Sequence, residues 1–140
     1  MTEEKLFEIQ TEKIVNGTNL FRDTQIVSFS GDLSSLEIGS YMFSESQLEY
    51  FDWKGGNDLT SNVLDIDNSA NMFDGCYLNS TAVENIYDML SKTTNTSVNA
   101  NSEFIISING NNIGAINAIE EKFGVYINHD YETGTHSNTT

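Results

Sequence analysis

The sequence predicts an α/β fold in which about three short repeats of strands and helical turns stack as a solenoid. A C-terminal helix and a strand-helix-strand unit close the stack. Two observations lead to this prediction: one phrase recurs along the first half of the chain, and the second half has helical and strand periodicities without that phrase. Repeats at a regular spacing are typical of folds in which each unit buries its apolar face against its neighbours.

The recurring phrase is a Leu or Met followed by Phe, then four intervening residues, then Ile or Leu, and a further apolar residue three positions later. The third copy departs from it, with Thr81 in the last position. The copies are spaced by 42 − 20 = 22 and then 72 − 42 = 30 residues, near the roughly 20–29 residues of leucine-rich repeats. We expect the repeat core to consist of Leu20, Phe21, Ile26, Phe29, Met42, Phe43, Leu48, Phe51, Met72, Phe73, Cys76 and Leu78.

Each repeat is expected to place its Leu-Phe or Met-Phe pair on a short helical turn. Short strands are expected over residues 25–29 and 47–51, with their apolar residues inward. The phenylalanines of the pairs should stack as a ladder, one per repeat. The second repeat is longer by 30 − 22 = 8 residues. We place this extra length around residues 53–57, because Gly-Gly-Asn is typical of loops.

A chain of 140 residues has room for about one domain. We expect that domain to span residues 1–128, with an N-terminal segment (1–15), the repeats (16–80) and a C-terminal cap (81–128). Residues 129–140 are interpreted as a polar tail. The N-terminal segment is placed to cover the exposed end of the repeat core, as solenoids require.

Several segments outside the repeats have a clear periodicity. Phe7 and Ile9 alternate with polar residues, as in a half-buried strand. Residues 104–108 are a continuous apolar run that suits a buried strand. Residues 112–123 have apolar residues on one side, as in a helix, and residues 125–127 form a final strand. A strand, a helix and a strand of this length fit a crossover between parallel strands.

Residues 81–93 predict a further helix. Thr81 is a suitable N-cap, and Glu84 three residues later completes a capping box. Apolar residues follow at the spacing of one helical stripe: Val83, Ile86, Tyr87 and Leu90.

The charge of the chain is strongly negative, with 21 acidic residues against 6 basic residues and a net charge of −15. Between Asp23 and Asp88 there are 12 acidic residues and a single basic residue, Lys54. Such a field repels nucleic acid and anionic membranes, and it suits a basic partner, divalent cations or simple solubility.

No apolar run approaches the roughly 18 residues of a membrane helix. The acidic N-terminus does not resemble a secretory signal.

The residue types that perform catalysis or bind metals do not form a recognisable set, and we expect no catalytic site, metal or cofactor. Cys76 is the single cysteine, so no internal disulfide forms, and no basic neighbour in the sequence would activate it. The two histidines, His129 and His136, lie in the predicted tail and lack zinc-site spacing. The acidic turn at Asp65 fails the EF-hand pattern, because Ala70 replaces the required glycine.

The repeats resemble the leucine-rich repeats of the bacterial surface-antigen (BspA-like) type. Residues 72–78, Met-Phe-Asp-Gly-Cys-Tyr-Leu, contain the phrase Phe-x-Gly-Cys-x-Leu of that family. Leu20-Phe21, Met42-Phe43 and the Asp-Leu-Ser-Ser-Leu turn at 32–36 also resemble it, in variants that look like those of phage and mobile-element proteins of gut-type bacteria. The resemblance implies a leucine-rich-repeat-like solenoid with a binding or structural role. The small number of repeats favours an accessory module.

From these observations we expect a non-enzymatic protein-interaction or structural module. The leading expectation is a phage virion accessory protein, of the decoration, fibre-associated or tail-associated kind, bound to another protein in a larger assembly. Two alternatives remain open: a surface adhesin domain that binds a host protein or glycan, and an acidic inhibitor that mimics nucleic acid. The expected location is the virion, or otherwise the cytoplasm or the cell surface. Neither nucleic-acid binding nor membrane insertion is expected.

The extra residues of the second repeat are the best candidate for partner contact, because Trp and Tyr are enriched at binding hot spots. Insertions in repeat proteins also map to loops on one face, often the binding face. Two interpretations are open for this segment: Tyr50 and Trp53 are exposed and contact a partner, or the insertion packs onto its own solenoid. The candidate contact residues are Tyr50, Trp53, Lys54, Gly55 and Gly56.

Overall fold

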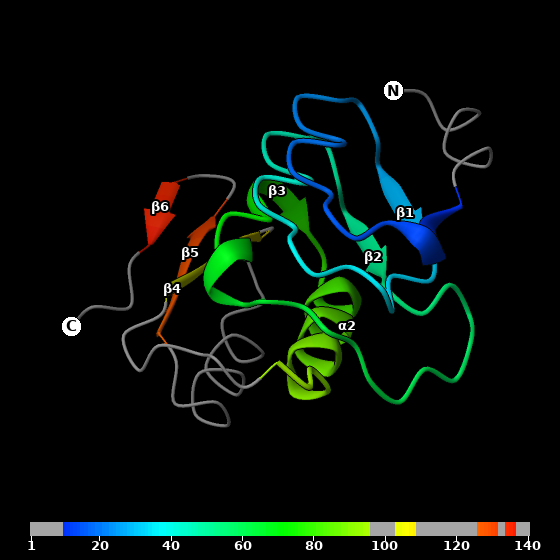
Figure 1. Ribbon diagram of the computed structural model, residues 1–140. Helices are drawn as coiled ribbons and strands as arrows, with labels where there is room; N and C mark the ends of the chain where they lie inside the picture. Colours follow the sequence, from blue (N-terminus) through cyan, green and yellow to red (C-terminus); the bar gives the residue numbers. More distant parts are fainter. Residues whose placement is uncertain (1–9, 96–102, 109–125, 132–133, 137–140) are drawn as a thin grey trace.

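The computed structural model describes residues 10–95, 103–108, 126–131 and 134–136 (Figure 1). Strands β1 and β2 form a parallel two-stranded sheet, and β3 to β6 form a four-stranded sheet in the order β3-β4-β5-β6. The described elements are η1 (Thr11–Lys13), β1 (Ser28–Ser30), β2 (Tyr50–Asp52), η2 (Asp67–Ser69), β3 (Phe73–Leu78), α2 (Ser80–Ser91), β4 (Glu103–Ile108), β5 (Tyr126–Tyr131) and β6 (Gly134–His136).

Neighbouring repeats lie side by side and are joined by backbone hydrogen bonds at equivalent positions (Figure 1). The N–H of Phe21 donates to the carbonyl of Met42 at 2.7 Å, and the N–H of Phe43 donates to the carbonyl of Met72 at 2.9 Å. Phe29 of β1 lies opposite residue 51 of β2 in the parallel pair, an offset of 51 − 29 = 22 residues. The spacing of the sequence phrase is therefore also the offset between paired strands.

The predicted phenylalanine ladder is confirmed. The ring centroids of Phe21 and Phe43 are 5.2 Å apart, and those of Phe43 and Phe73 are 5.6 Å apart with nearly parallel rings. Phe29 and Phe51 form a second stack at 5.7 Å, and both meet the ring of Phe43 edge-on. All five side chains are fully buried. The other predicted core residues are also buried, except Leu20, which is half-buried.

The predicted helical turns are single turns bracketed by residues with positive φ. Asn19 and Asp23 lie two residues before and after the first phenylalanine, with φ of 60° and 59°. Tyr41 and Glu45 take the same places in the second repeat, with φ of 55° and 59°, and Gly75 follows the third phenylalanine with φ 81°. A left-handed conformation is strained for Tyr and Glu but not for Gly. The repeated backbone therefore tolerates some strain in the second repeat.

Strands β1 and β2 begin at residues 28 and 50, three residues later than the predicted starts. In the third repeat the chain enters strand β3 at Phe73, and helix α2 begins at Ser80. Helix therefore replaces the strand that follows the phrase in the first two repeats. This replacement explains why the third copy of the phrase has Thr81 rather than an apolar residue.

Helix α2 was predicted, but its cap was not. The N-cap is Asn79, whose side-chain oxygen accepts a hydrogen bond from the N–H of Ala82 at 2.9 Å. The prediction of Thr81 as N-cap is wrong, because Asn caps a helix at least as well as Thr and stands two residues earlier. Val83 and the other aliphatic residues of the predicted stripe are buried, and Tyr87 is half-buried.

Helix α2 packs alongside β2 (Figure 1). The side-chain amide of Asn85 donates to the backbone carbonyl of Phe51 at 2.8 Å. The helix thereby bonds to a backbone group of strand β2, and its buried face includes Ile86 and Leu90.

Strands β4 and β5 confirm the strands predicted at residues 104–108 and 125–127, and they pair in parallel as expected. The predicted polar tail is wrong for residues 129–131 and 134–136, which form the end of β5 and the antiparallel strand β6. His129 lies opposite His136 in that pair. Backbone pairing of polar strands leaves no apolar signal in the sequence. The N-terminal strand and the helix over residues 112–123 lie outside the described residues.

Candidate partner-binding surface

The eight extra residues of the second repeat fall in two places. The bridge between Asp32 and Lys54 keeps the offset of 54 − 32 = 22 residues. The N–H of Asp65 donates to the carbonyl of Glu37, an offset of 65 − 37 = 28. Six extra residues, 28 − 22, therefore lie between Lys54 and Asp65, and the remaining two lie near η2. The prediction that placed the insertion around residues 53–57 is wrong in its first two residues, which keep the regular register.

Trp53 is fully buried, so at this residue the interpretation of packing is confirmed and that of exposure is wrong. Its indole Nε1–H donates to Oδ2 of Asp88 in α2 at 3.3 Å. An indole buries more area than most side chains, so a Trp beside a helix that packs on its strand is easily absorbed into the core. Tyr50 is half-buried. The indole is therefore not part of the accessible surface.

Asp88 joins the start of the insertion to helix α2. One carboxylate oxygen lies 2.7 Å from Lys54 Nζ, and the other lies 2.9 Å from Lys92 Nζ. Partial burial tends to raise the pKa of Asp88, but hydrogen bonds from Lys54, Lys92 and Trp53 outweigh it, and the net pKa is lowered. The hydrogen bond to Asp88 raises the pKa of Lys54. Lys54 is thus engaged within the chain.

Replacement of Asp88 with Asn is expected to lower the free energy of unfolding by about 1–2 kcal/mol at neutral pH, because two ammonium groups lose their partner. The folded pKa of Asp88 lies below its ordinary value of 3.8. Its stabilisation is therefore fully present above that value and is lost as pH falls through the folded pKa. Urea unfolding at pH 7 and at pH 3 measures both effects.

The matched control for this prediction is Asp58→Asn, the same substitution at an exposed position. It should leave the urea midpoint nearly unchanged at pH 7. Equal midpoints for the two variants would contradict a structural role for the Asp88 carboxylate.

A tight turn follows Lys54. Both oxygens of the Asp52 carboxylate accept backbone hydrogen bonds, from the N–H of Lys54 and of Gly56, each at 3.1 Å. Gly55 has φ 60°, and a Cβ there would lie 3.0 Å from the Cα of Gly31. This position therefore requires glycine for both conformation and space. Gly56 has φ 85° and faces open space.

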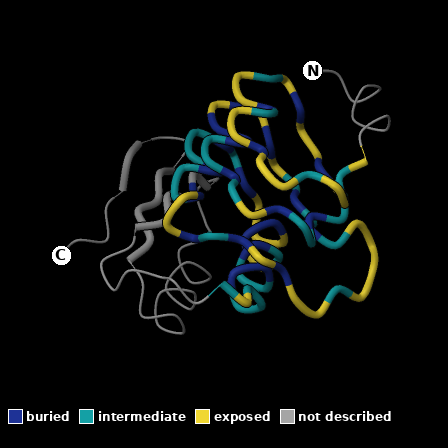
Figure 2. The backbone as a smooth tube through the Cα atoms, in the orientation of Figure 1, coloured by how far each residue is buried: buried dark blue, intermediate teal, exposed yellow. Residues whose placement is uncertain are grey.

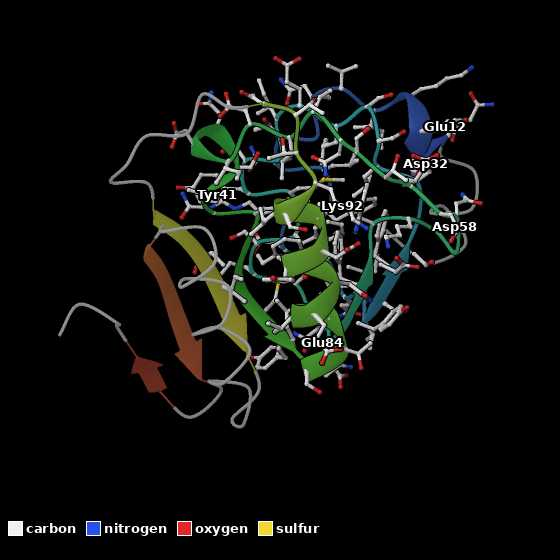
Figure 3. All side chains as sticks on the ribbon, turned by 90° about the horizontal axis from the view of Figure 1, so that it is seen from below. Glu12, Asp32, Tyr41, Asp58, Glu84 and Lys92 are labelled. Carbon is white, nitrogen blue, oxygen red and sulfur yellow. The ribbon has the colours of Figure 1, made fainter. Side chains whose placement is uncertain are left out.

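Beyond this turn the chain forms an exposed loop, residues 55–61, which we call the inserted loop (Figure 2). Asn62 ends it: its buried side-chain amide donates to the carbonyl of Met89 at 2.7 Å. Asp58 lies at the periphery of the molecule (Figure 3). The loop is therefore fixed at both ends, and Leu59 between them is half-buried against the core, while the other residues of the loop are exposed. The exposed residues of the loop that the predicted contact set did not include are Asn57, Asp58, Thr60 and Ser61.

The exposed side chains of Asn57 and Asp58 in the inserted loop should contribute little to stability. We expect the double substitution Asn57→Ala and Asp58→Ala to change the free energy of unfolding by less than about 0.5 kcal/mol, as is usual for exposed residues without special contacts. Thermal and urea unfolding measure this. A clear loss of stability would show that the side chains of Asn57 and Asp58 are needed for folding and are not free for a partner.

Cys76 is buried and does not form a reactive site. Its thiol donates to the carbonyl of Phe43 at 3.2 Å and lies 3.7 Å from the Ser46 hydroxyl. Burial raises the pKa of the Cys76 thiol to about 12, and the hydrogen bond with Ser46 lowers it by a smaller amount.

We expect a disulfide reagent to modify Cys76 only as fast as the protein unfolds. Modification in native buffer as fast as in urea would contradict this burial.

Within the described ranges, no three His, Cys, Asp or Glu side chains gather into a group that could hold a metal ion. No helix in that part of the chain is long and apolar enough to cross a membrane.

Comparison of the chain with protein-family models, with curated proteins and with solved structures found no match.

Proposed function

We propose that residues 16–80 form a short leucine-rich-repeat-like solenoid and that the protein is a non-enzymatic protein-binding module. Two stacks of phenylalanine rings fill the space between the repeats. The acidic side chains are left at the surface or half-buried. With the rings packed inside the stack and the carboxylates outside it, the outer surface is available to a partner.

The distribution of charge is the observation that carries this proposal. Lys54 is the single base among twelve acids between residues 23 and 88, and it is paired with Asp88. Asp23 and Glu45 are exposed on neighbouring repeats, and the N–H of Glu45 donates to the carbonyl of Asp74 on the next. Acidic residues therefore occupy neighbouring backbone positions in successive repeats. A basic surface on a partner protein is the complement of such a field.

Within this class we propose an accessory role in a larger assembly, of the kind that the resemblance to repeats of phage proteins implies. Decoration and fibre-associated proteins need a stable body and an accessible surface rather than a catalytic site. The inserted loop, anchored by Asp52 and Asn62, supplies a second accessible surface. Co-purification of the chain with phage particles would support this role, and its absence from purified particles would contradict it.

The salt dependence of binding tests the acidic surface. After a partner has been identified by cross-linking and mass spectrometry, its association rate should fall several-fold between 0.01 M and 0.15 M salt, because the Debye length shortens from about 30 Å to about 8 Å. The variants Asp23→Asn and Glu45→Gln should slow association at low salt. Glu84→Gln, on exposed α2 surface, is the control for an equal change of charge. An association rate independent of salt would overturn the proposal.

A further inference from the structure

The single arginine of the chain, Arg22, is held in place on the outer surface of the first repeat. Its guanidinium carbon lies 4.6 Å from the ring centroid of Tyr41, which belongs to the second repeat. One guanidinium nitrogen, Nη1, donates a hydrogen bond to Oδ1 of Asn19 at 3.2 Å. The ring and the side-chain amide therefore hold the charged group in position, although Arg22 is exposed.

Tyr41 adopts a backbone conformation that its residue type disfavours. Its φ of 55° is in the left-handed region, where a bulky residue is uncommon. Asn19 has the equivalent place in the first repeat with φ of 60°, and Asn is one of the residue types that enter this region readily. The turn itself therefore does not call for a tyrosine, and backbone strain of this kind is frequent at functional sites. What the ring supplies is the contact with Arg22.

A guanidinium held in this way is suited to binding a carboxylate. It has five N–H donors in a rigid plane, and the hydrogen bond to Asn19 uses one of them. Stacking on the Tyr41 ring engages the face of the plane, whereas a carboxylate binds along an edge through two parallel hydrogen bonds. Because the side chain is already held, less conformational entropy is lost on binding. Arg and Tyr are also enriched among the residues that dominate protein–protein affinity.

The charges beside Arg22 are acidic. Asp23 follows it directly and is exposed, and its N–H donates to the carbonyl of Ser44 at 3.0 Å, the residue before the exposed Glu45. An isolated anion would be repelled by a chain of net charge −15. The complement of this arrangement is a carboxylate flanked by basic side chains. A charge of opposite sign at one position fixes the register of such a partner, since like charges brought together are costly.

We propose that Arg22, held by Tyr41 and Asn19, determines the specificity of the acidic surface by binding a carboxylate that the partner protein carries among its basic side chains. The inference rests on the proposed function, because it names a group that the basic surface of the partner must include. Tyr41 is a positioning residue, since it acts through Arg22. This surface is distinct from the inserted loop, because Tyr41 and Asp58 lie on opposite sides of the repeats (Figure 3).

Two fluorescent peptides test the proposal on the full chain, with binding measured by anisotropy at 0.01 M salt, where the Debye length is about 30 Å. The first peptide is Lys-Gly-Lys-Gly-Glu-Gly-Lys-Gly-Lys, and the second has Gln in place of Glu. By charge alone the Gln peptide should bind this acidic chain more tightly, because it has the greater positive charge. We expect the reverse order, with the Glu peptide binding about threefold more tightly. Equal or tighter binding of the Gln peptide would overturn the proposal.

Variants of the chain assign the preference to one residue. Arg22→Gln should restore the order that charge alone gives, with the Gln peptide bound more tightly. Lys13→Gln, the same change of charge at an exposed residue of η1, is the matched control and should keep the preference for the Glu peptide. A preference that survives Arg22→Gln, or that Lys13→Gln also removes, would contradict the proposal. If neither peptide bound saturably, the acidic surface itself would fail, and the proposed function with it.

Replacing Tyr41 with Asn separates positioning from folding. The variant has the residue type that the first repeat has at this place and relieves the left-handed strain, so its urea midpoint should equal or exceed that of the original chain. The preference for the Glu peptide should nevertheless be lost, because no ring holds the guanidinium. Tyr41→Phe keeps the ring and should keep the preference. An unchanged preference in Tyr41→Asn would overturn the positioning role, and a lower urea midpoint would show that the ring is needed for folding.

Discussion

Replacing Phe43 with Ala is expected to lower the free energy of unfolding by about 3–5 kcal/mol, the usual range for a fully buried phenylalanine. The Phe43 ring stacks between those of Phe21 and Phe73 and meets Phe29 and Phe51 edge-on. Its removal therefore opens a cavity at the junction of both stacks. Because domains of this size are typically stable by about 5–15 kcal/mol, the variant should be close to unfolding at body temperature. Urea unfolding followed by circular dichroism measures the loss.

Two further variants separate packing from simple hydrophobicity. Phe43→Leu keeps an apolar side chain but loses the ring stacking, and it should lose less stability than Phe43→Ala. Val63→Ala removes an exposed apolar group and should change stability by less than about 0.5 kcal/mol. A melting curve unchanged by Phe43→Ala would contradict the alignment of the repeats on their phenylalanines.

The sequence was informative where one residue type recurs at one spacing. The ladder of Phe21, Phe43 and Phe73 follows from this spacing, because a large apolar ring at equivalent places in neighbouring repeats has no other place to be buried. The stripe of helix α2 was predictable for the same reason, since residues three and four apart lie on one face. In both cases local periodicity and tertiary burial agree.

Sequence reasoning failed where the outcome depends on a partner distant in the chain. The cap of α2 depends on whether Asn79 or Thr81 meets the first free N–H groups, which is decided by where β3 ends. Strand β6 forms by backbone pairing with the end of β5, and a short polar strand has no apolar alternation to reveal it. Such pairings depend on register rather than composition.

The candidate contact surface was predicted only in part. Gly55 and Gly56 do begin the exposed loop, because Gly-Gly is a reliable loop signal. The hot-spot tendency of Trp is an average over interfaces, and it does not distinguish an indole at an interface from one in a core. At Trp53 the deciding feature is Asp88, which stands 35 residues later on the helix that packs beside the strand.

Replacing Trp53 with Ala is therefore expected to destabilise the protein by about 3–5 kcal/mol, as for other fully buried large aromatic residues. The substitution leaves a cavity in place of the buried indole and removes the hydrogen bond from the indole N–H to Asp88. Trp53→Phe keeps most of the apolar volume and should lose less, with the remaining loss reflecting the indole N–H. Thermal unfolding of the two variants beside Asp88→Asn distinguishes packing from hydrogen bonding. If Trp53→Ala melted normally and yet weakened partner binding, the indole would have to leave the core to reach the partner. The inserted loop would then be a moving element rather than one fixed at both ends by Asp52 and Asn62.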